Sequence, residues 1–270
     1  MNTDERPRKS LGQCFLTDPR IAARIVSLGD VGHLDRVVEI GPGRGILTRV
    51  LAERAAEVTA IELDPRWSAA LREEFAGNAR VRIEHADALA YPFEELASGF
   101  KVIANLPYNV STPLLFRLLS LRDRISLLVL MLQREVVDRL LARPGTKAYG
   151  ALSVAVAYAA NVRKGFPVAA GSFFPRPAVQ SSVVVITPRA TPAITVHDEA
   201  LLMRVIRGAF SHRRKVLANA LTDEGFEKPG VAAALERAEI DPARRGETLS
   251  LEEFGRLADA VAALRTERSG

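Results

Sequence analysis

The sequence lacks several features that would place it in common classes of protein. It has one cysteine, Cys14, so no disulfide can form within the chain, which fits the reducing cytoplasm where we expect the protein to reside. Its four histidines do not cluster, and with a single cysteine they make no plausible zinc set, so no metal site is predicted. No stretch approaches roughly 18 uninterrupted apolar residues, and the charged N-terminus lacks the apolar segment of a signal peptide. We therefore expect no membrane span and no membrane partner.

Charge of one sign is in only modest excess. The chain of 270 residues carries a formal net charge of +5, and its isoelectric point is about 9.6. This balance permits an anionic partner such as nucleic acid without requiring one. The rest of the composition is ordinary for a globular protein, with 48% hydrophobic and 26% charged residues, so the chain has the material for a sizeable core.

About the first two-thirds of the chain alternates short β-branched runs with segments of helical periodicity. This alternation predicts a parallel sheet covered by helices. Strands are expected at residues 37–40, 58–62, 81–84, 100–105 and 127–133, with helices at 46–55, 66–75 and 149–160. Two later strand-like runs, 162–168 and 182–187, flank a turn rich in glycine and proline, so we expect a hairpin near one sheet edge.

The pattern changes after Pro188. Residues 187–195 contain Pro188 and Pro192 and have the character of a linker, and from about Asp198 onward the periodicity is helical only. Ser250 and Glu253 have the spacing of a capping box that starts the last helix. We therefore predict an α/β domain over residues 1–188 and a small helical domain over 195–270.

A glycine-rich loop follows the first predicted sheet strand and leads into a helix. Gly41 and Gly43 allow a tight turn and a close approach of the backbone to a ligand, and Glu62 ends the next strand about 20 residues on, where a carboxylate can accept hydrogen bonds from ribose. The arrangement predicts a cofactor that contains adenosine. It does not by itself decide between a dinucleotide and S-adenosylmethionine.

Two residues of this loop favour S-adenosylmethionine. Pro42 removes one N–H that a pyrophosphate would use, and Glu39 would repel phosphate but tolerate the cationic sulfonium and ammonium groups of the methyl donor. The alternative interpretation of Glu39 is a solvated residue at the end of a strand.

The segment Asn105-Leu106-Pro107-Tyr108 directly follows the fourth predicted sheet strand, so it faces the same crevice as the glycine loop. An aromatic amine is a poor nucleophile, because its lone pair is delocalised into the ring. The side-chain oxygen of Asn105 and the main-chain oxygen of Leu106 could accept its two N–H groups and direct the lone pair at a methyl group. The segment therefore predicts methylation of an exocyclic amine.

Such a target cannot be reached inside a base-paired stack, so the base must be flipped or unpaired. Tyr108 could stack on one face of it, and Phe173, in an aromatic pair on a proline-stiffened loop, is the best candidate for the second wall. Ordinary core packing is the alternative interpretation of Phe173, and a simple turn is the alternative for residues 105–108.

Over nearly its whole length the sequence closely resembles the KsgA-type small-subunit rRNA adenine N6,N6-dimethyltransferases. The matching segments occur in the same order as in that family: residues 9–16 (KSLGQCFL), 39–43 (EIGPG), 61–64 (IELD), 87–88 (DA), 105–112 (NLPYNVST), 131–136 (MLQREV), 147–150 (KAYG), 173–181 (FFPRPAVQS), 210–215 (FSHRRK) and 240–242 (IDP). The resemblance implies a Rossmann-like class I methyltransferase sheet with a small C-terminal all-helical domain. It also implies an enzyme that uses S-adenosylmethionine to dimethylate two adjacent adenosines near the 3′ end of small-subunit (16S) rRNA, late in subunit assembly.

The resemblance also assigns roles to individual positions. Asn105, Leu106, Tyr108 and Phe173 would form the catalytic site, with the target adenine between the two rings. Contacts to the methyl donor would come from Cys14, Leu16, Gly41, Gly43, Glu62, Asp87 and Asn105. The family usually has Asn or His where Cys14 stands; because a thiol is a weak hydrogen-bonding group, only a main-chain contact is expected to be retained there.

Four basic residues of the helical domain, Arg207, Arg213, Arg214 and Lys215, are expected on one helix stretch, where they could bind RNA phosphates; solvated surface charge is the alternative. The expected partner is small-subunit rRNA within a pre-ribosomal 30S particle, and we expect a monomer. Two other functions remain open: a large-subunit rRNA adenine methylase of the resistance type, and a non-catalytic rRNA-binding assembly factor.

Overall fold

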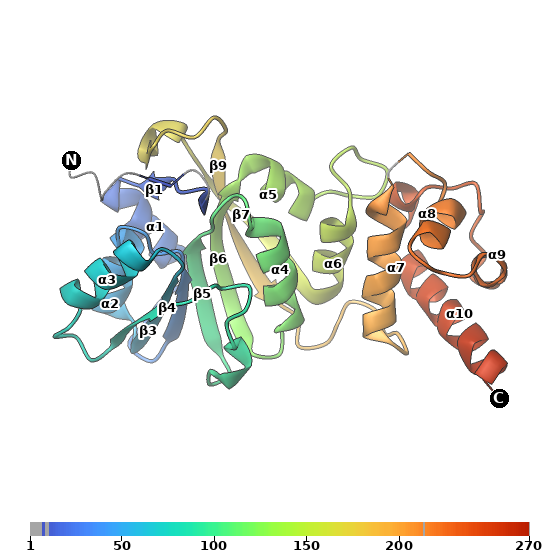
Figure 1. Ribbon diagram of the computed structural model, residues 1–270, viewed down its shortest axis with the longest axis horizontal. Helices are drawn as coiled ribbons and strands as arrows, with labels where there is room; N and C mark the ends of the chain where they lie inside the picture. The colour runs from blue at the N-terminus through green and yellow to red at the C-terminus, as the bar shows by residue number, and fades with distance from the viewer. Residues whose placement is uncertain (1–6, 9–10, 213, 270) are drawn as a thin grey trace. The chain divides into compact units, whose positions relative to one another are not determined.

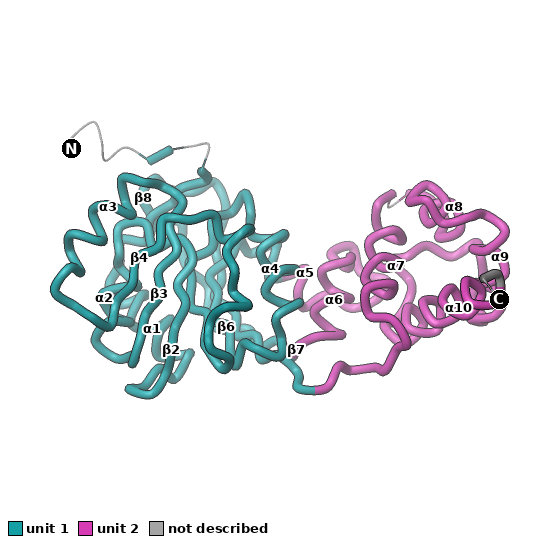
Figure 2. The backbone as a smooth tube through the Cα atoms, turned by 60° about the horizontal axis from the view of Figure 1, so that its bottom comes forward, with its two compact units in different colours: residues 1–137, 161–190 teal, residues 138–160, 191–270 magenta. Residues whose placement is uncertain are grey.

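The computed structural model describes residues 7–8, 11–212 and 214–269, and the chain divides into two compact units (Figure 2). The first unit comprises Met1–Val137 and Asn161–Ala190, and the second comprises Asp138–Ala160 and Thr191–Gly270. The sequence pattern placed residues 138–160 with the sheet. The structure instead groups them with the C-terminal helices, because helix α6 (Ala151–Ala159) is apolar on nearly all sides and is enclosed by other helices.

A seven-stranded sheet forms the centre of the first unit, in the order β4-β3-β2-β5-β6-β9-β7 (Figure 1). The pairings from β4 through to β6 are parallel, and β9 runs antiparallel to β6. The bounds are β2 Arg36–Ile40, β3 Glu57–Glu62, β4 Val81–His85, β5 Phe100–Asn105, β6 Ile125–Gln133, β7 Ala160–Val168 and β9 Ser181–Pro188. Each predicted strand is thus confirmed, and β7 and β9 are neighbours at one edge, as the predicted hairpin requires.

Helices cover both faces of the sheet, because the inner strands β2, β6 and β9 carry continuous runs of buried, mostly apolar residues whose side chains point alternately to the two faces. Residues of one face, such as Val37, Ile103 and Met131, pack in a core with α1 (Pro19–Leu28) and α2 (Ile46–Arg54). Helix α3 (Pro65–Glu74) packs on the same face through Leu71 against Ala60 and Ile83. Helix α4 (Ser111–Ser120) connects β5 to β6 and lies on the opposite face of the sheet (Figure 1). The strand order advances in opposite directions on the two sides of β2, so right-handed connections place their helices on opposite faces.

The strand order creates a crevice beside β2. From β2 the chain moves through β3 to β4 on one side and then returns to β5 on the other side. In an open parallel sheet, the carboxyl ends of strands on either side of such a reversal leave room for a ligand. The glycine loop follows β2 and the segment 105–108 follows β5, so the topology brings the two to one place.

A second, two-stranded sheet ties the N-terminal segment to a distant loop. Strand β1 (Phe15–Leu16) pairs antiparallel with β8 (Phe173–Phe174), with Phe15 opposite Phe174 and Leu16 opposite Phe173. Successive side chains of a strand point to opposite sides, so the two phenylalanines of β8 have different surroundings. This pairing fixes which of the two rings is buried.

The second unit is helical, as predicted. Helix α7 (Glu199–Ser211) begins at Asp198, whose carboxylate accepts a hydrogen bond from the Leu201 N–H, and α10 (Leu251–Ser269) begins with the predicted exchange between Ser250 and Glu253. The remaining helices of this unit are α6, α8 (Leu217–Asp223) and α9 (Lys228–Arg237), while α5 (Arg134–Leu140) crosses the boundary between the units. Among the described residues, every helix is too short or too polar to cross a membrane.

Candidate active site

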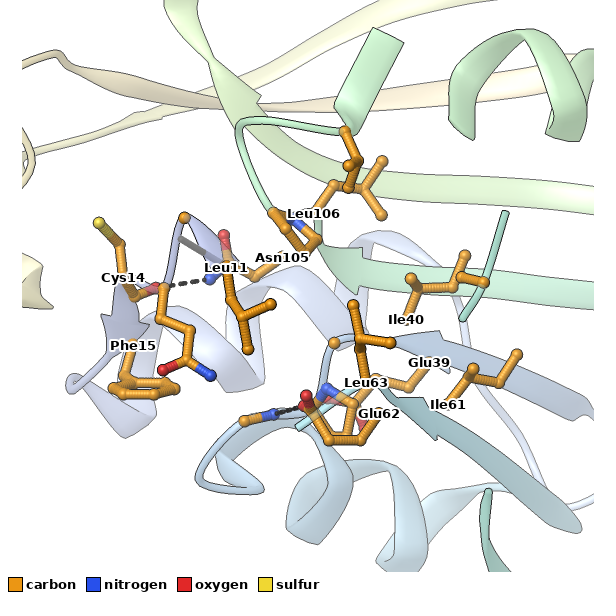
Figure 3. A pocket seen from close by; sticks show the side chains of 18 of the residues that line it. Leu11, Cys14, Phe15, Glu39, Ile40, Ile61, Glu62, Leu63, Asn105 and Leu106 are labelled. Carbon is orange, nitrogen blue, oxygen red and sulfur yellow. Dashed lines mark hydrogen bonds between the residues drawn. The ribbon is translucent and has the colours of Figure 1, made fainter. Parts of the chain in front are cut away.

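One cavity lies at the carboxyl ends of β2, β3 and β5 (Figure 3). Its lining combines the N-terminal segment, the glycine loop and the segment that contains Asn105. The two loops also touch, since a Cβ atom added at Gly41 would lie 3.3 Å from the ring of Pro107. The sequence argument depended on the glycine loop and Asn105 opening onto the same space, and the structure confirms that they do.

The glycine loop adopts a backbone that other residues rarely accept. Gly41 and Gly43 have φ angles of +69° and +54°, in the left-handed region. A Cβ at Gly43 would also lie 2.7 Å from the ring of Phe15, so this ring packs directly on the loop backbone. The Gly43 N–H donates a hydrogen bond of 2.9 Å to Oε2 of Glu62, which joins the loop to the end of β3.

Two carboxylates face the cavity from the ends of neighbouring strands. Glu62 is 6% exposed, and its Oε1 accepts the Asp64 N–H at 2.8 Å; burial raises its pKa, while the backbone N–H groups act in the opposite sense. Asp87 follows β4, is exposed, and is oriented by a hydrogen bond of 2.8 Å from the Leu89 N–H to its Oδ1. Both side chains retain acceptor positions, because each carboxylate oxygen has two lone pairs.

Glu39 does not fit the charge argument made from the sequence. It lines the cavity but is 1% exposed, and the Thr48 hydroxyl donates to its Oε2 at 2.7 Å. Burial raises its pKa to about 8, so the carboxyl is largely protonated at neutral pH and contributes little negative charge. The alternative of a solvated strand-end residue is wrong as well, for the same reason.

The amide of Asn105 is held in one orientation. Its Nδ2 lies 3.1 Å from the main-chain oxygen of Cys14, and because a carbonyl oxygen only accepts, the amide nitrogen must be the atom that faces it (Figure 3). The amide oxygen, Oδ1, is buried and finds no hydrogen-bond donor among the residues that the structure describes. A buried acceptor without a partner is costly, so a hydrogen-bond donor brought to this oxygen would be favoured.

The residues after Asn105 complete this side of the cavity. Leu106 is 1% exposed, and its N–H donates to the Met131 main-chain oxygen at 3.2 Å, which fixes the plane of the peptide between Asn105 and Leu106. Tyr108 is half-buried and lines the cavity, and its hydroxyl shares a hydrogen bond of 2.6 Å with Oγ of Ser181. An oriented amide oxygen, a fixed main chain and an aromatic ring therefore surround one space.

Comparison with known proteins accounts for this arrangement. A sequence model of the ribosomal RNA adenine dimethylase family matches residues 4–262. The chain belongs to this family. It is 49% identical over 259 residues to the ribosomal RNA small subunit methyltransferase A of Moorella thermoacetica, covering 92% of this chain and 90% of the relative. The protein of the same name from Geobacter metallireducens is 47% identical over 266 residues, covering 96% and 97%.

Solved structures agree with the family assignment. A dimethyladenosine transferase from Plasmodium falciparum has a TM-score of 0.76 and 27% identity, with 95% of this chain and 98% of that chain covered. The 23S rRNA methyltransferase ErmE has a TM-score of 0.64 and 25% identity, with 92% and 99% covered. The predicted class I methyltransferase sheet with a C-terminal helical part is confirmed, and the protein is an rRNA methyltransferase of this dimethylase family.

The N-terminal segment of this dimethylase supplies more of the cavity than the sequence suggested. Cys14 and Leu16, which were predicted to contact the methyl donor, both line it, and the main-chain oxygen of Cys14 accepts the hydrogen bond from Asn105. Gln13, which the sequence argument left without a role, donates from Nε2 to Asp64 at 2.9 Å and so holds the segment against the start of α3. Leu63, also overlooked, lines the cavity with 48% of its surface exposed. Its position directly after Glu62 was the sequence feature that could have predicted its place in the cavity.

The structure does not bring Phe173 to the cavity. Its ring is 4% exposed and packs in the core beside Leu16, and it is absent from the residues that line the cavity. Core packing, the alternative interpretation, describes its position here. The next residue, Phe174, points the other way: it is 40% exposed, and its ring centre lies 5.7 Å from the guanidinium carbon of Arg44.

The basic residues of the dimethylase's second unit are arranged differently from the prediction. Arg207 is exposed on α7, but that helix ends at Ser211, so Arg214 and Lys215 follow the helix instead of lying on it. Lys215 is exposed and forms an ion pair of 2.6 Å with Asp223. Arg213 lies outside the described residues, as do Lys9 and Ser10 of the N-terminal motif.

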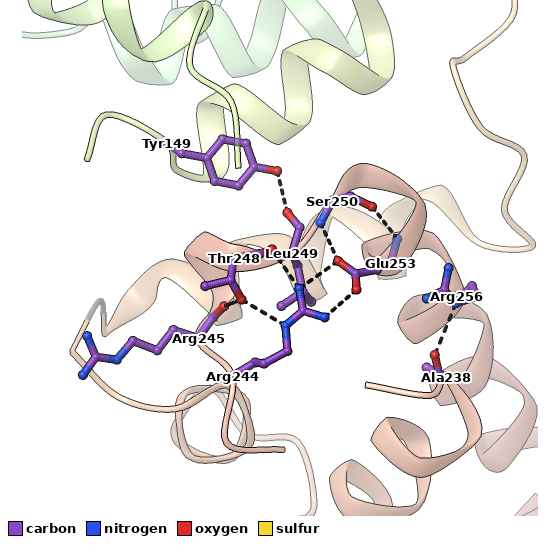
Figure 4. A network of polar contacts seen from close by, with 9 residues as sticks. All are labelled: Tyr149, Ala238, Arg244, Arg245, Thr248, Leu249, Ser250, Glu253 and Arg256. Atoms are coloured by element: carbon purple, nitrogen blue, oxygen red, sulfur yellow. Dashed lines mark hydrogen bonds and ion pairs between the residues drawn. The ribbon is translucent and has the colours of Figure 1, made fainter. Parts of the chain in front are cut away.

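Arg244 and Arg245 show how adjacent arginines differ in role (Figure 4). The Arg244 guanidinium bonds to the carboxylate of Glu253 and, at 2.8 Å, to the main-chain oxygen of Thr248, and the same carboxylate caps α10. Arg245 accepts a hydrogen bond from the Thr248 hydroxyl at its main-chain oxygen, but its side chain extends away from this network and the residue is exposed. Arg244 is therefore occupied in holding the loop before α10, while Arg245 is presented to solvent.

Proposed function

We propose that this protein transfers methyl groups from S-adenosylmethionine to N6 of two adjacent adenosines near the 3′ end of small-subunit rRNA, forming N6,N6-dimethyladenosine. The observation that carries the proposal is the position of Asn105, which lines the same cavity as the glycine loop and whose buried Oδ1 lacks a donor among the described residues. The names of the relatives that are 49% and 47% identical, both small-subunit rRNA methyltransferases, support the choice of subunit.

The proposed chemistry at the amine is positioning by hydrogen bonds. The amide oxygen of Asn105 accepts one N–H of the adenine amine, and the main-chain oxygen of Leu106 accepts the other. The Asn105 amide is oriented beforehand by the Cys14 carbonyl, and the peptide between Asn105 and Leu106 is held by the Met131 carbonyl, so little reorganisation of this segment is needed when the amine attacks. No strong general base is required, because the nitrogen becomes acidic only after it has gained the methyl group.

The residues present fit S-adenosylmethionine. Two carboxylates at strand ends, Glu62 and Asp87, would accept hydrogen bonds from the ribose and from the adenine amino group, and the left-handed backbone at Gly41 admits a ligand close to the main chain. When bound, this cofactor supplies a methyl group made electrophilic by the sulfonium. Cys14, Leu16 and Gly43 line the same space and are proposed as further contacts.

Tyr108 would stack on the flipped adenine, since a base taken out of its stack needs an aromatic surface that returns roughly 1–3 kcal/mol. Phe173 would serve as the second wall only if its ring left the core position that it has here. Exposed Arg207 and Arg214, together with Arg213 and Lys215, are proposed to bind phosphates of a pre-ribosomal 30S particle. We further propose that the protein acts in the cytoplasm, late in subunit assembly, as a monomer.

The test is mapping of methylated nucleotides after incubation with unmethylated small subunits and labelled donor. We expect dimethylation at two adjacent adenosines near the 3′ end of the rRNA, loss of transfer in Asn105→Ala, and nearly unchanged subunit binding by that variant. Asn161→Ala, an exposed asparagine on β7, is the matched control and should retain transfer. Methylation of large subunits instead would favour the resistance-type activity, and binding of small subunits without transfer would favour a non-catalytic assembly factor.

A further inference from the structure

Ser181 is the first residue of β9 and has an unusual environment for a hydroxyl. It is 1% exposed, and it begins a strand whose next residues are almost all buried. Its Oγ lies 2.6 Å from the hydroxyl oxygen of Tyr108, from which it is 73 positions distant in sequence. A buried hydroxyl costs free energy unless it is paired, so the two side chains satisfy each other.

The main chain around Ser181 fixes the position of this hydroxyl. Ser181 pairs with Gln133 in the antiparallel ladder between β6 and β9, and the Arg134 N–H donates to the Gln180 main-chain oxygen at 2.9 Å. Tyr108, by contrast, lies in the loop between β5 and α4, outside any regular element. The hydrogen bond therefore connects the hydroxyl of Tyr108, which lies on a loop, to Ser181, whose main chain is held in the sheet.

We propose that Ser181 is a positioning residue that sets the plane of the Tyr108 ring for stacking on the target adenine. The ring of a tyrosine is placed by two torsions, and a hydrogen bond at the hydroxyl restricts both. Stacking requires the ring and the base to be nearly parallel and close, so a ring free to tilt would hold the base and its amine less well. This inference rests on the proposed function, in which Tyr108 is a wall of the adenine site.

The neighbouring residue offers a matched control. Ser182 is 2% exposed and bonds to the main-chain oxygen of Phe166 at 3.4 Å, on the side of β9 away from Tyr108. Ser181→Ala and Ser182→Ala each remove one buried hydroxyl from the same strand. An effect on transfer that came only from a weakened strand would appear in both variants.

The experiment measures methyl transfer to unmethylated small subunits, donor affinity by calorimetry, and melting temperature. We expect Ser181→Ala to lower kcat/KM for the subunit by about tenfold without changing the dissociation constant of the donor, and Ser182→Ala to stay within about twofold of the wild type. Tyr108→Phe should show a loss similar to that of Ser181→Ala. The double variant that combines Ser181→Ala with Tyr108→Phe should have a kcat/KM no lower than that of the poorer single variant, because both substitutions remove the same hydrogen bond.

Two results would overturn the role of Ser181: equal kcat/KM values for the Ser181→Ala and Ser182→Ala variants, or losses that multiply in the double variant. If the wild type transfers methyl groups normally and either result is found, only the role of Ser181 is rejected and the proposed function stands. Absence of transfer by the wild type would reject the proposed function and the role of Ser181 with it.

Discussion

The side-chain nitrogen of Asn105 donates a hydrogen bond to the main-chain oxygen of Cys14, although the two residues are 91 positions apart in the sequence. The bond joins the end of β5 to the segment before β1, and both line the candidate active site. Because the acceptor belongs to the backbone, the orientation of the Asn105 amide depends on the path of the N-terminal segment and not on the identity of residue 14.

Replacement of Cys14 tests this relationship. Cys14→Ser keeps the main-chain oxygen, so we expect kcat/KM for methyl transfer to stay within about twofold of the wild type. Burial raises the pKa of the Cys14 thiol, so the thiol is neutral and offers only a weak hydrogen-bonding group to be lost. Steady-state kinetics on unmethylated small subunits checks the prediction. A loss greater than tenfold in both Cys14→Ser and Cys14→Ala would show that the side chain itself takes part.

The glycine loop should be intolerant of a methyl group at residue 43. Gly43→Ala places a Cβ 2.7 Å from the Phe15 ring at a φ of +54°, so the loop or the ring must move. We expect the dissociation constant of S-adenosylmethionine, measured by calorimetry, to rise at least tenfold. The control is Gly230→Ala in α9, where nothing lies within 4 Å of the added atom. This control should bind the donor normally and raise the free energy of unfolding by up to about 1 kcal/mol, and a similar affinity for both variants would contradict the prediction.

The buried carboxyl of Glu39 should make stability depend on pH. Its pKa is raised from 4.5 to about 8 by burial, so between these values the folded state keeps a proton that the unfolded state releases. The folded state therefore binds more protons, and the free energy of unfolding falls as pH rises through this interval, by at most about 1.4 kcal/mol per pH unit. Glu39→Gln removes this contribution.

Urea denaturation of the wild type and of Glu39→Gln, at several pH values between about 5 and 8, measures the difference. We expect the stability of the wild type relative to the variant to decrease steadily with rising pH. Parallel curves for the two proteins would show that Glu39 does not hold its proton in the folded state.

Arginines of the second unit should differ in their contribution to RNA binding. Arg207→Ala and Arg214→Ala each remove an exposed cation, and each should reduce the slope of log affinity against log salt by about one if the residue contacts a phosphate. Arg237→Ala serves as the control, because this arginine is paired with Glu267 at 2.8 Å and is not expected to contact RNA. Filter binding of small subunits over a range of salt concentrations gives the slopes, and equal slopes for all three variants would reject the proposed contacts.

Several features of the site could be predicted from the sequence because their causes are local. The left-handed backbone of the glycine loop follows from Gly41 and Gly43 themselves, and the convergence of this loop with Asn105 follows from a general rule for parallel sheets. The partner of Ser181 could not be predicted, since a hydroxyl at the start of an apolar strand indicates only that some partner is needed.

The sequence by itself determined the strands of the large sheet, the helical character of the C-terminal part, the loop chemistry around the adenosine site and the family, because periodicity, glycine placement and contiguous motifs are properties of short segments. Only the tertiary structure decided that Phe173 is buried and Phe174 exposed, that Glu39 is enclosed so that burial raises its pKa, and that residues 138–160 belong with the C-terminal helices. The burial and the hydrogen-bond partners of a side chain depend on chain segments that are distant in sequence, and a local sequence pattern does not indicate which distant segment will pack against it.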